Sequence, residues 1–278
     1  MITTDIKGGL GNQLFQIFNL ISCSIDMNTV FVIERVNVSP SIGEDRKVYW
    51  DTLLKNIANN CRVMKFNFPV WMESGSGYDE IPKIAPSQHV KINGYFQSYK
   101  YFEHNMDKID NILGLSNIIE EVKKENEMDY ENTISLHFRV GDYVNLQDVH
   151  PLMSIDYYKN ALKRLVEETR RDDWKVIYYY EEGDKEYVEE KVNQLRSLYD
   201  NMRFEGCDTK MDDWKQMLQM SLCRHNVIAN SSFSWWGAYL NKWVDKKVLY
   251  PSFWYSLKAI EHKVNHLVKD EWIKVEAE

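Results

Sequence analysis

The strongest constraint on the fold is a regular alternation of short apolar segments with helical patterns in the second half of the chain. Segments typical of buried strands occupy 133–140, 175–180, 202–204, 226–229 and 247–250. These strands are separated by segments that are typical of helices, either because apolar residues recur at helical spacing or because the segment has the length of a helix. The helical segments are 155–170, 185–199, 211–223 and 233–243. Strands joined by helices of this length pair in parallel, in a sheet covered on both faces. The second half therefore predicts a Rossmann-like α/β domain.

The first half predicts a looser version of the same plan. A strand at 2–7, a glycine turn at 8–11, a helix with one buried stripe and a strand at 29–36 form a βαβ unit. Breakers blur the pattern over 37–90, and a strand follows at 90–97. The charged segment 120–127 is typical of a solvated helix end and linker, so we expect domains at 1–128 and 129–278.

The amino-acid composition limits which partners the protein can bind and in which cellular compartment it is expected. The chain has 34 Lys and Arg against 42 Asp and Glu, a net charge of −8, which disfavours nucleic acid. The four cysteines form no Cys-x-x-Cys pair and are expected to be buried thiols in a reducing compartment. The longest charge-free stretch, 8–25, is too polar for a transmembrane anchor, and the start of the chain is unlike a signal peptide. We expect a cytoplasmic protein.

The first candidate for chemistry is the end of the predicted strand 133–140. His137 and Arg139 alternate with apolar residues and should project from the same face of the strand. They lie at its carboxyl end, the edge where open α/β sheets bind ligands. An Arg there can hold a phosphate with a planar fork of donors. The alternative is that both side chains make only structural bonds to the following loop.

The second candidate is a serine-rich helix start after the predicted strand 226–229. Hydroxyl groups and free backbone N–H groups at a helix start can bind a pyrophosphate. Plain helix capping is the alternative, although one cap does not need so many hydroxyls. The adjacent Trp235 and Trp236 are more typical of a core than of ligand stacking. The residues concerned are Ser231, Ser232, Phe233 and Ser234.

The third candidate is the glycine turn, which is weak evidence alone. It matches neither Gly-x-Gly-x-x-Gly nor a P-loop, which makes an NAD-dependent oxidoreductase or a P-loop NTPase improbable. Asn12 and Gln13 after the turn can supply hydrogen bonds to a sugar or nucleotide. The chain also has no Asp-x-Asp pair of the kind that holds a divalent ion on a diphosphate. A cation-independent site would leave Arg139 and the serine-rich helix start to neutralise that charge.

Four blocks of the sequence together resemble the α-1,2-fucosyltransferase family. They occur in the family's order and span nearly the whole chain: Gly8-Gly-Leu-Gly-Asn-Gln-Leu-Phe-Gln16, Gly94-Tyr-Phe-Gln-Ser98, His137-Phe-Arg-Val-Gly-Asp-Tyr143 and Ala229-Asn-Ser-Ser-Phe-Ser-Trp-Trp-Gly-Ala238.

The resemblance implies a GT-B fold, two Rossmann-like domains facing a cleft. It also implies inverting transfer of L-fucose from GDP-fucose to the 2-hydroxyl of a galactose-type glycan acceptor, without a metal or other cofactor. Arg139 would contact the diphosphate and stabilise departing GDP, and His137 would help to hold the nucleotide. Ser231, Ser232, Phe233 through its backbone, and Ser234 would cradle the phosphates, while Asn12 and Gln13 would lie on the donor side of the other domain.

Two points stay open at this stage. The family commonly has a second arginine where this chain has Val140, which bears on donor affinity or donor choice. Asp142, a candidate catalytic residue, and Asp148 are the carboxylates nearest to Arg139 in the sequence, and proton transfer to the phosphate itself is equally open, so the base that removes the acceptor proton stays unassigned. A fucosyltransferase of another linkage or acceptor, or a glycan-binding relative with weak catalysis, are the competing functions.

Overall fold

The structure, a computed structural model, describes residues 1–41, 45–63, 65–74, 77–83, 85, 87–256 and 266–277. The chain forms two compact units, Met1–Ile118 with Glu261–Lys269, and Ile119–Ile260 with Asp270–Glu278. The division lies inside helix α3 (Leu115–Glu125), upstream of the boundary expected near Met128. Near the end of the chain, the Ser98 hydroxyl donates to the carbonyl of His266 at 3.1 Å, which ties this returning segment to the first unit.

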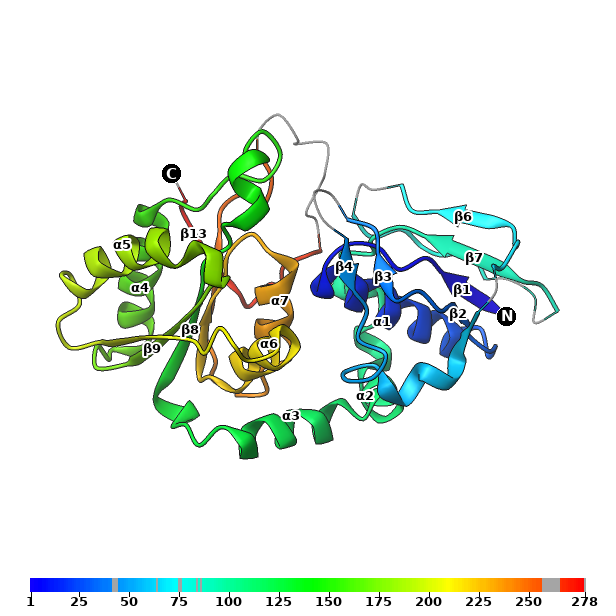
Figure 1. Cartoon of the computed structure of the whole chain (residues 1–278), viewed down its shortest axis with the longest axis horizontal. Helices are drawn as coiled ribbons and strands as arrows, with labels where there is room; N and C mark the ends of the chain where they lie inside the picture. Colours follow the sequence, from blue (N-terminus) through cyan, green and yellow to red (C-terminus); the bar gives the residue numbers. More distant parts are fainter. Residues whose placement is uncertain are drawn as a thin grey trace. The chain divides into compact units, whose positions relative to one another are not determined.

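The second unit is built on a six-stranded parallel sheet in the order β10-β9-β8-β11-β12-β13. Figure 1 shows α4 and α5 on one face of this sheet and α6 and α7 on the other. The α/β prediction of a parallel sheet covered on both faces is confirmed. The strands are β8 (Thr133–His137), β9 (Lys175–Tyr179), β10 (Arg203–Gly206), β11 (His225–Val227), β12 (Val248–Pro251) and β13 (Ile273–Val275).

Short helices complete the second unit and place the site loops. Strand β13 was not predicted, because three residues are too short to show a periodic pattern. The α-helices are α4 (Ile155–Thr169), α5 (Lys185–Arg196), α6 (Asp213–Leu222) and α7 (Ser232–Tyr239). The 3-10 helices are η4 (Tyr130–Asn132), η5 (Gly141–Asn145) and η6 (Glu182–Asp184).

The strand order creates a switch point between β8 and β11. The chain adds β9 and β10 on one side of β8, then crosses over through α6 to place β11 on the other side. In such sheets the two connections leave a crevice at the carboxyl ends of the central strands, where ligands bind. Helix α4 supports both strands, because the buried Tyr158 hydroxyl donates to the carbonyl of His137 at 3.0 Å and the Tyr157 hydroxyl donates to that of Ile228.

The first unit has a smaller parallel sheet, β1-β7-β6, with two further strand pairs. The pair β2-β5 is parallel and β3-β4 is antiparallel. Its strands are β1 (Ile2–Thr4), β2 (Ile33–Glu34), β3 (Val38–Ser39), β4 (Arg46–Lys47), β5 (Cys61–Arg62), β6 (Val70–Met72) and β7 (Val90–Asn93). Its helices are α1 (Leu10–Asp26), α2 (Met106–Leu113), η1 (Lys55–Asn60), η2 (Tyr99–Tyr101) and η3 (Glu103–Asn105).

Helix α1 differs from the expected amphipathic helix with one buried stripe. It is buried on most sides, including polar residues such as Gln13, Gln16 and Asn19. Buried polar groups are tolerated where they are hydrogen-bonded. The Gln16 amide meets this condition, because it exchanges two hydrogen bonds with the backbone of Lys7 at 2.8 and 2.9 Å. The glycine turn is thereby fastened to the helix that follows it.

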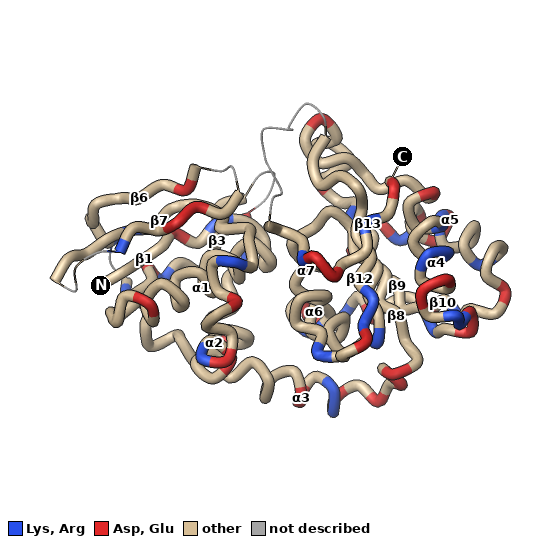
Figure 2. Tube along the Cα trace, turned by 180° about the vertical axis from the view of Figure 1, so that it is seen from behind, with Lys and Arg blue, Asp and Glu red and all other residues tan. Residues whose placement is uncertain are grey.

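The surface charges of the second unit are mixed. In Figure 2 the Lys and Arg positions of α4 and α5 are interspersed with Asp and Glu positions. Several form ion pairs within one helix, such as Arg164 with Glu168 at 2.7 Å and Arg196 with Glu189 at 3.1 Å. Among the described residues, none of the helices is long and apolar enough to cross a membrane.

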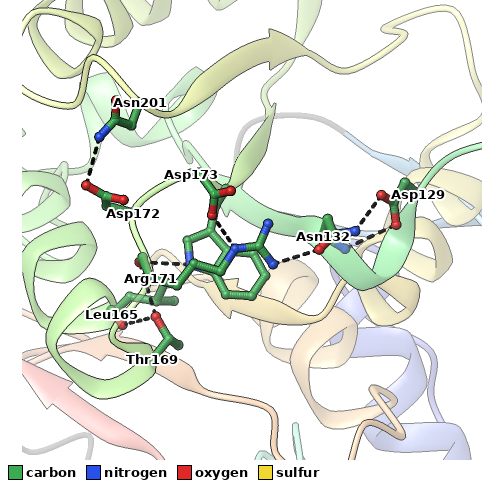
Figure 3. Close-up of polar contacts among 9 residues, drawn as sticks. Asp129, Asn132, Leu165, Thr169, Arg171, Asp172, Asp173 and Asn201 are labelled. Carbon is green, nitrogen blue, oxygen red and sulfur yellow. Dashed lines mark hydrogen bonds and ion pairs between the residues drawn. The ribbon is translucent and has the colours of Figure 1, made fainter.

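An arginine-centred network holds the amino edge of the large sheet, the edge opposite the carboxyl ends of β8 and β11 (Figure 3). The Arg171 guanidinium lies 4.0 Å from the centre of the Trp174 ring, donates to Asn132 Oδ1 at 2.6 Å and pairs with Asp173. Trp174 in turn packs edge-on against His225, the first residue of β11. The network joins the starts of β8, β9 and β11.

We expect Arg171→Ala to lower the free energy of unfolding by about 1–3 kcal/mol, because it removes a cation–π contact and a hydrogen bond to a part-buried amide. Arg164→Ala is the matched control, since the Arg164 side chain is 51% exposed and its ion pairs within α4 should be worth less than about 0.5 kcal/mol. Urea denaturation measures both. Equal losses in the two variants would contradict a role for Arg171 in joining the strands.

Candidate active site

The large sheet brings together the two segments that the sequence singled out, the strand end at 137–139 and the serine-rich helix start at 231–234. Strands β8 and β11 are neighbours, with Leu136 opposite Val227, so His137 and the start of α7 follow at the same edge. The rings of His137 and Phe233 lie 5.5 Å apart between centroids. The strand end and the serine-rich helix start therefore lie together at the switch point, where open α/β sheets bind ligands, and we take them as the candidate site.

The start of α7 combines capping with spare polar groups. Ser231 is the N-cap, and its hydroxyl accepts from the backbone N–H of Phe233 at 3.3 Å. The Ser234 hydroxyl donates to the carbonyl of Ser231 at 3.4 Å, whereas Ser232 is half-buried at the first helical position. Capping thus accounts for Ser231, and Trp235 and Trp236 are fully buried, as expected of core residues. The α7 dipole and its first N–H groups suit an anion.

Arg139 is surrounded by groups that hold its guanidinium. One terminal nitrogen pairs with Asp142 and the other with Glu181, and the group lies 4.8 Å from the centre of the Tyr143 ring. The Tyr143 hydroxyl donates to the carbonyl of Asn230, immediately before the α7 cap, at 3.1 Å. Burial alone would lower the pKa of Arg139, but the carboxylates and Tyr143 outweigh it and raise that pKa. A permanent positive charge is therefore oriented at the sheet edge.

His137 is an uncharged ring at neutral pH. Burial, with a smaller contribution from the positive charge of Arg139, lowers its pKa to about 3. Its Nδ1 atom is buried and has no hydrogen-bond partner among the described residues. An imidazole in this state can accept or donate one hydrogen bond without bringing a charge to the site.

Two acidic residues of this site were missed by sequence analysis. Glu181 pairs with Arg139, and Asp184 accepts the backbone N–H of Gly141 at 3.0 Å. Both follow β9, which is the neighbour of β8, so their loop reaches the same edge. The available signal was their position just after a predicted strand, but the sequence does not say which strands are neighbours. Val140 is buried in the core of this unit, as its place on the apolar face of the strand predicts.

In the first unit, Asn12 and Gln13 make internal contacts. Gln13 is fully buried, and its amide nitrogen donates to the carbonyls of Gly8 and Lys47 at 3.0 and 2.9 Å. Asn12 Oδ1 accepts from the Gln97 amide at 2.7 Å, which joins the glycine turn to the block 94–98. Gln13 thus fastens the turn in place, and a contact of either residue with the donor stays a prediction.

A part-buried carboxylate, Glu73, shapes the block 94–98. Glu73 accepts the backbone N–H groups of Tyr95 and Phe96 at 2.8 and 2.9 Å, and the Tyr101 hydroxyl donates to it at 3.1 Å. Phe96 has a left-handed backbone with φ of 52°, which these bonds hold in place. Burial is the largest cause of the raised pKa of Glu73. The bonds fix the turn that presents Gln97 to Asn12.

All four cysteines are buried and free, as expected. Burial raises the pKa of the Cys23 and Cys223 thiols to about 12. Within the part of the chain that the structure describes, there is no cluster of three or more His, Cys, Asp or Glu side chains suited to a metal ion.

Comparison with known proteins assigns the class and then the family. The family model "Glycosyl transferase family 11" matches residues 1–276. An α-1,2-colitosyltransferase of Escherichia coli is 23% identical, with 99% of each chain covered. The O-antigen biosynthesis glycosyltransferase WbnK of Escherichia coli is 30% identical over 69% of this chain and 63% of its own length. A galactoside 2-α-L-fucosyltransferase of Caenorhabditis elegans is 24% identical over 87% and 69%.

The protein is therefore a glycosyltransferase. It belongs to glycosyltransferase family 11, the α-1,2-fucosyltransferase family, and the resemblance found in the sequence is confirmed.

The buried, neutral His137 predicts a loss of stability in acid. Its folded pKa of about 3 lies below the unfolded value of about 6.5, so the unfolded chain binds an extra proton between these values. Stability is thus lost as the pH falls through this window, by up to about 1.4 kcal/mol per pH unit for this residue. Urea unfolding at pH 7 and pH 5 should show a smaller acid loss for His137→Asn than for the original chain. Equal losses would mean that the ring is not buried and neutral.

Proposed function

We propose that the protein transfers L-fucose, with inversion, from GDP-fucose to the 2-hydroxyl of a galactose-type glycan acceptor, without a metal ion. The observation that carries the proposal is that Arg139 and the start of α7 follow neighbouring strands at one edge of the sheet and are linked through Tyr143, whose ring lies against the guanidinium and whose hydroxyl donates to the carbonyl of Asn230. An oriented guanidinium and a helix N-terminus are two ways in which a protein can neutralise a diphosphate with its own groups. Membership of the family supports the reaction class.

Each group has a role in this proposal. Arg139 takes up the negative charge that develops on GDP as the bond to the sugar breaks, which is worth most where the donor is already oriented. The hydroxyl of Ser232 and the first N–H groups of α7 hold the phosphates, and Ser231 and Ser234 keep that helix start in shape. The neutral His137 ring supplies a hydrogen bond to the nucleotide without adding charge.

A base must take up the proton of the acceptor hydroxyl as the new bond to the sugar forms. Asp142 is the proposed base, and its ion pair with Arg139 also keeps the guanidinium oriented. Asp148 is the alternative carboxylate, and its backbone carbonyl accepts the Ser256 hydroxyl. Transfer of the proton to the departing phosphate, through a loose transition state, is the other route.

GDP-colitose is a second candidate donor. A relative named as an α-1,2-colitosyltransferase matches over 99% of each chain. Colitose is fucose without its 3-hydroxyl group, so the same diphosphate site would serve either sugar. Discrimination would then depend on whether the protein hydrogen-bonds that hydroxyl.

The donor is identified by offering GDP-fucose and GDP-colitose separately with a β-galactoside, in EDTA, and measuring GDP release and product mass. We expect transfer from GDP-fucose without added divalent ion, and none to a 2-deoxy-galactoside, which lacks the accepting hydroxyl. GDP-mannose is the control donor. Activity restored only by a divalent ion would overturn the metal-free mechanism. Oligosaccharide binding without transfer from any of these donors would favour a glycan-binding relative.

Replacing Arg139 tests the site itself. Arg139→Ala should lower kcat/KM for transfer by about 10² or more, because a preorganised charge stabiliser is lost and two carboxylates are left facing the diphosphate. Arg164→Ala, which removes an equal charge from the exposed face of α4, should keep near-normal rates. Circular dichroism confirms that both variants are folded. A near-normal rate for Arg139→Ala would remove Arg139 from the mechanism.

A further inference from the structure

Arg139 already has counterions at both of its terminal nitrogens. Asp142, three residues later, occupies one of them, and Glu181, from the loop after β9, occupies the other. The two carboxylates differ in surroundings, since the side chain of Glu181 is 52% exposed and that of Asp142 is 26% exposed. An incoming diphosphate has to compete with these groups for the same donors.

The loop after β8 is shaped to admit Glu181. Gly141 has φ of +39°, and a Cβ atom there would lie 3.3 Å from Glu181 Oε2 and 3.5 Å from an Arg139 terminal nitrogen. Its backbone N–H is held by Asp184 at 3.0 Å. A side chain at position 141 would crowd the ion pair, so the absence of one lets Glu181 lie against Arg139.

The charge balance at this point opposes an anion. Asp142, Glu181 and Asp184 contribute three carboxylates against one guanidinium. The mutual influence of these carboxylates is visible at Asp184, where burial first, and then Glu181 and Asp142, raise the pKa. A diphosphate at Arg139 would gain the guanidinium but would face this residual negative charge.

We propose that Glu181 is a displaceable counterion of Arg139, which holds the guanidinium in the absence of donor and is pushed aside by the diphosphate. This rests on the proposed function, in which a diphosphate binds at Arg139. Glu181 is the carboxylate that leaves, because its side chain is half exposed and water can replace the ion pair with little loss of free energy. Asp142 has a shorter side chain, is less exposed and lies only three residues after Arg139, so it stays paired.

As a consequence, Glu181 lowers the affinity of the protein for both the nucleotide-sugar donor and the GDP product. Glu181 competes with the phosphates for Arg139, so it raises the Kd for GDP and promotes release of GDP after transfer. Its effect should act on ligands that carry phosphate and leave the bare nucleoside unaffected. A purely structural role would have the opposite sign, because loss of a supporting contact would weaken ligand binding.

Calorimetry on the full chain tests this with Glu181→Gln, which keeps the shape and removes the charge. We expect the Kd for GDP and for inorganic pyrophosphate to fall by about three- to tenfold, as for removal of one part-exposed charge next to an anion. The Kd for guanosine should not change. In transfer assays the KM for the donor should fall, and kcat should stay level or decrease if GDP release limits turnover.

Glu205→Gln is the matched control. Glu205 is also ion-paired, at 2.7 Å to Lys175, and its side chain is 64% exposed, but it lies on the edge strand β10, two strands away from β8. The control should leave all three Kd values near those of the original chain. A Glu181→Gln chain that binds GDP no better than Glu205→Gln, or more weakly, would overturn the displaceable counterion while leaving the proposed function intact.

The remaining outcomes separate the two proposals. If the original chain binds pyrophosphate but not GDP, the choice of nucleotide is wrong, and a tighter pyrophosphate complex of Glu181→Gln would still support the role of Glu181. If the original chain binds neither ligand, both proposals fail, because no diphosphate then competes for Arg139.

Discussion

The pairing of β8 with β11 positions Arg139 and the start of α7, the two groups that carry the proposed donor site. The two strands are about ninety residues apart in the chain, yet their carboxyl ends lie side by side because the sheet reverses its direction of growth between them. Arg139 and the start of α7 follow these two ends, and β9 brings Glu181 and Asp184 from the other flank of β8. The parallel hydrogen-bonding of the central strands is thus the condition for assembling the site.

The distinctive feature of this edge of the sheet is its arrangement of charged side chains. One guanidinium is shared by two carboxylates, and a third carboxylate holds the turn between them. The neighbouring histidine is uncharged, since burial opposes its protonation. Val140, the residue after Arg139, belongs to the core. The positive charge of Arg139 at this edge is therefore largely compensated by carboxylates among the described residues.

The first unit relies on buried polar contacts to fix its turns. Gln13 and Gln16 fasten the glycine turn to α1, and Glu73 holds the turn that carries Gln97. Such groups are costly to bury without partners, so each fixes one local geometry. Helix α1 is consequently buried on most sides although its sequence is rich in amides.

The sequence by itself determined the parallel α/β plan of the second unit, the family, and the candidate segments at 137–139 and 231–234. Periodicity and motif blocks are local properties, and they survive without knowledge of the fold. Only the tertiary structure decided that Glu181 and Asp184 lie beside the Arg139 segment, that the Gln13 amide holds the glycine turn and that β13 completes the sheet. These depend on which strands become neighbours and on which polar groups are buried, and both are set by long-range pairing and packing that no local pattern encodes.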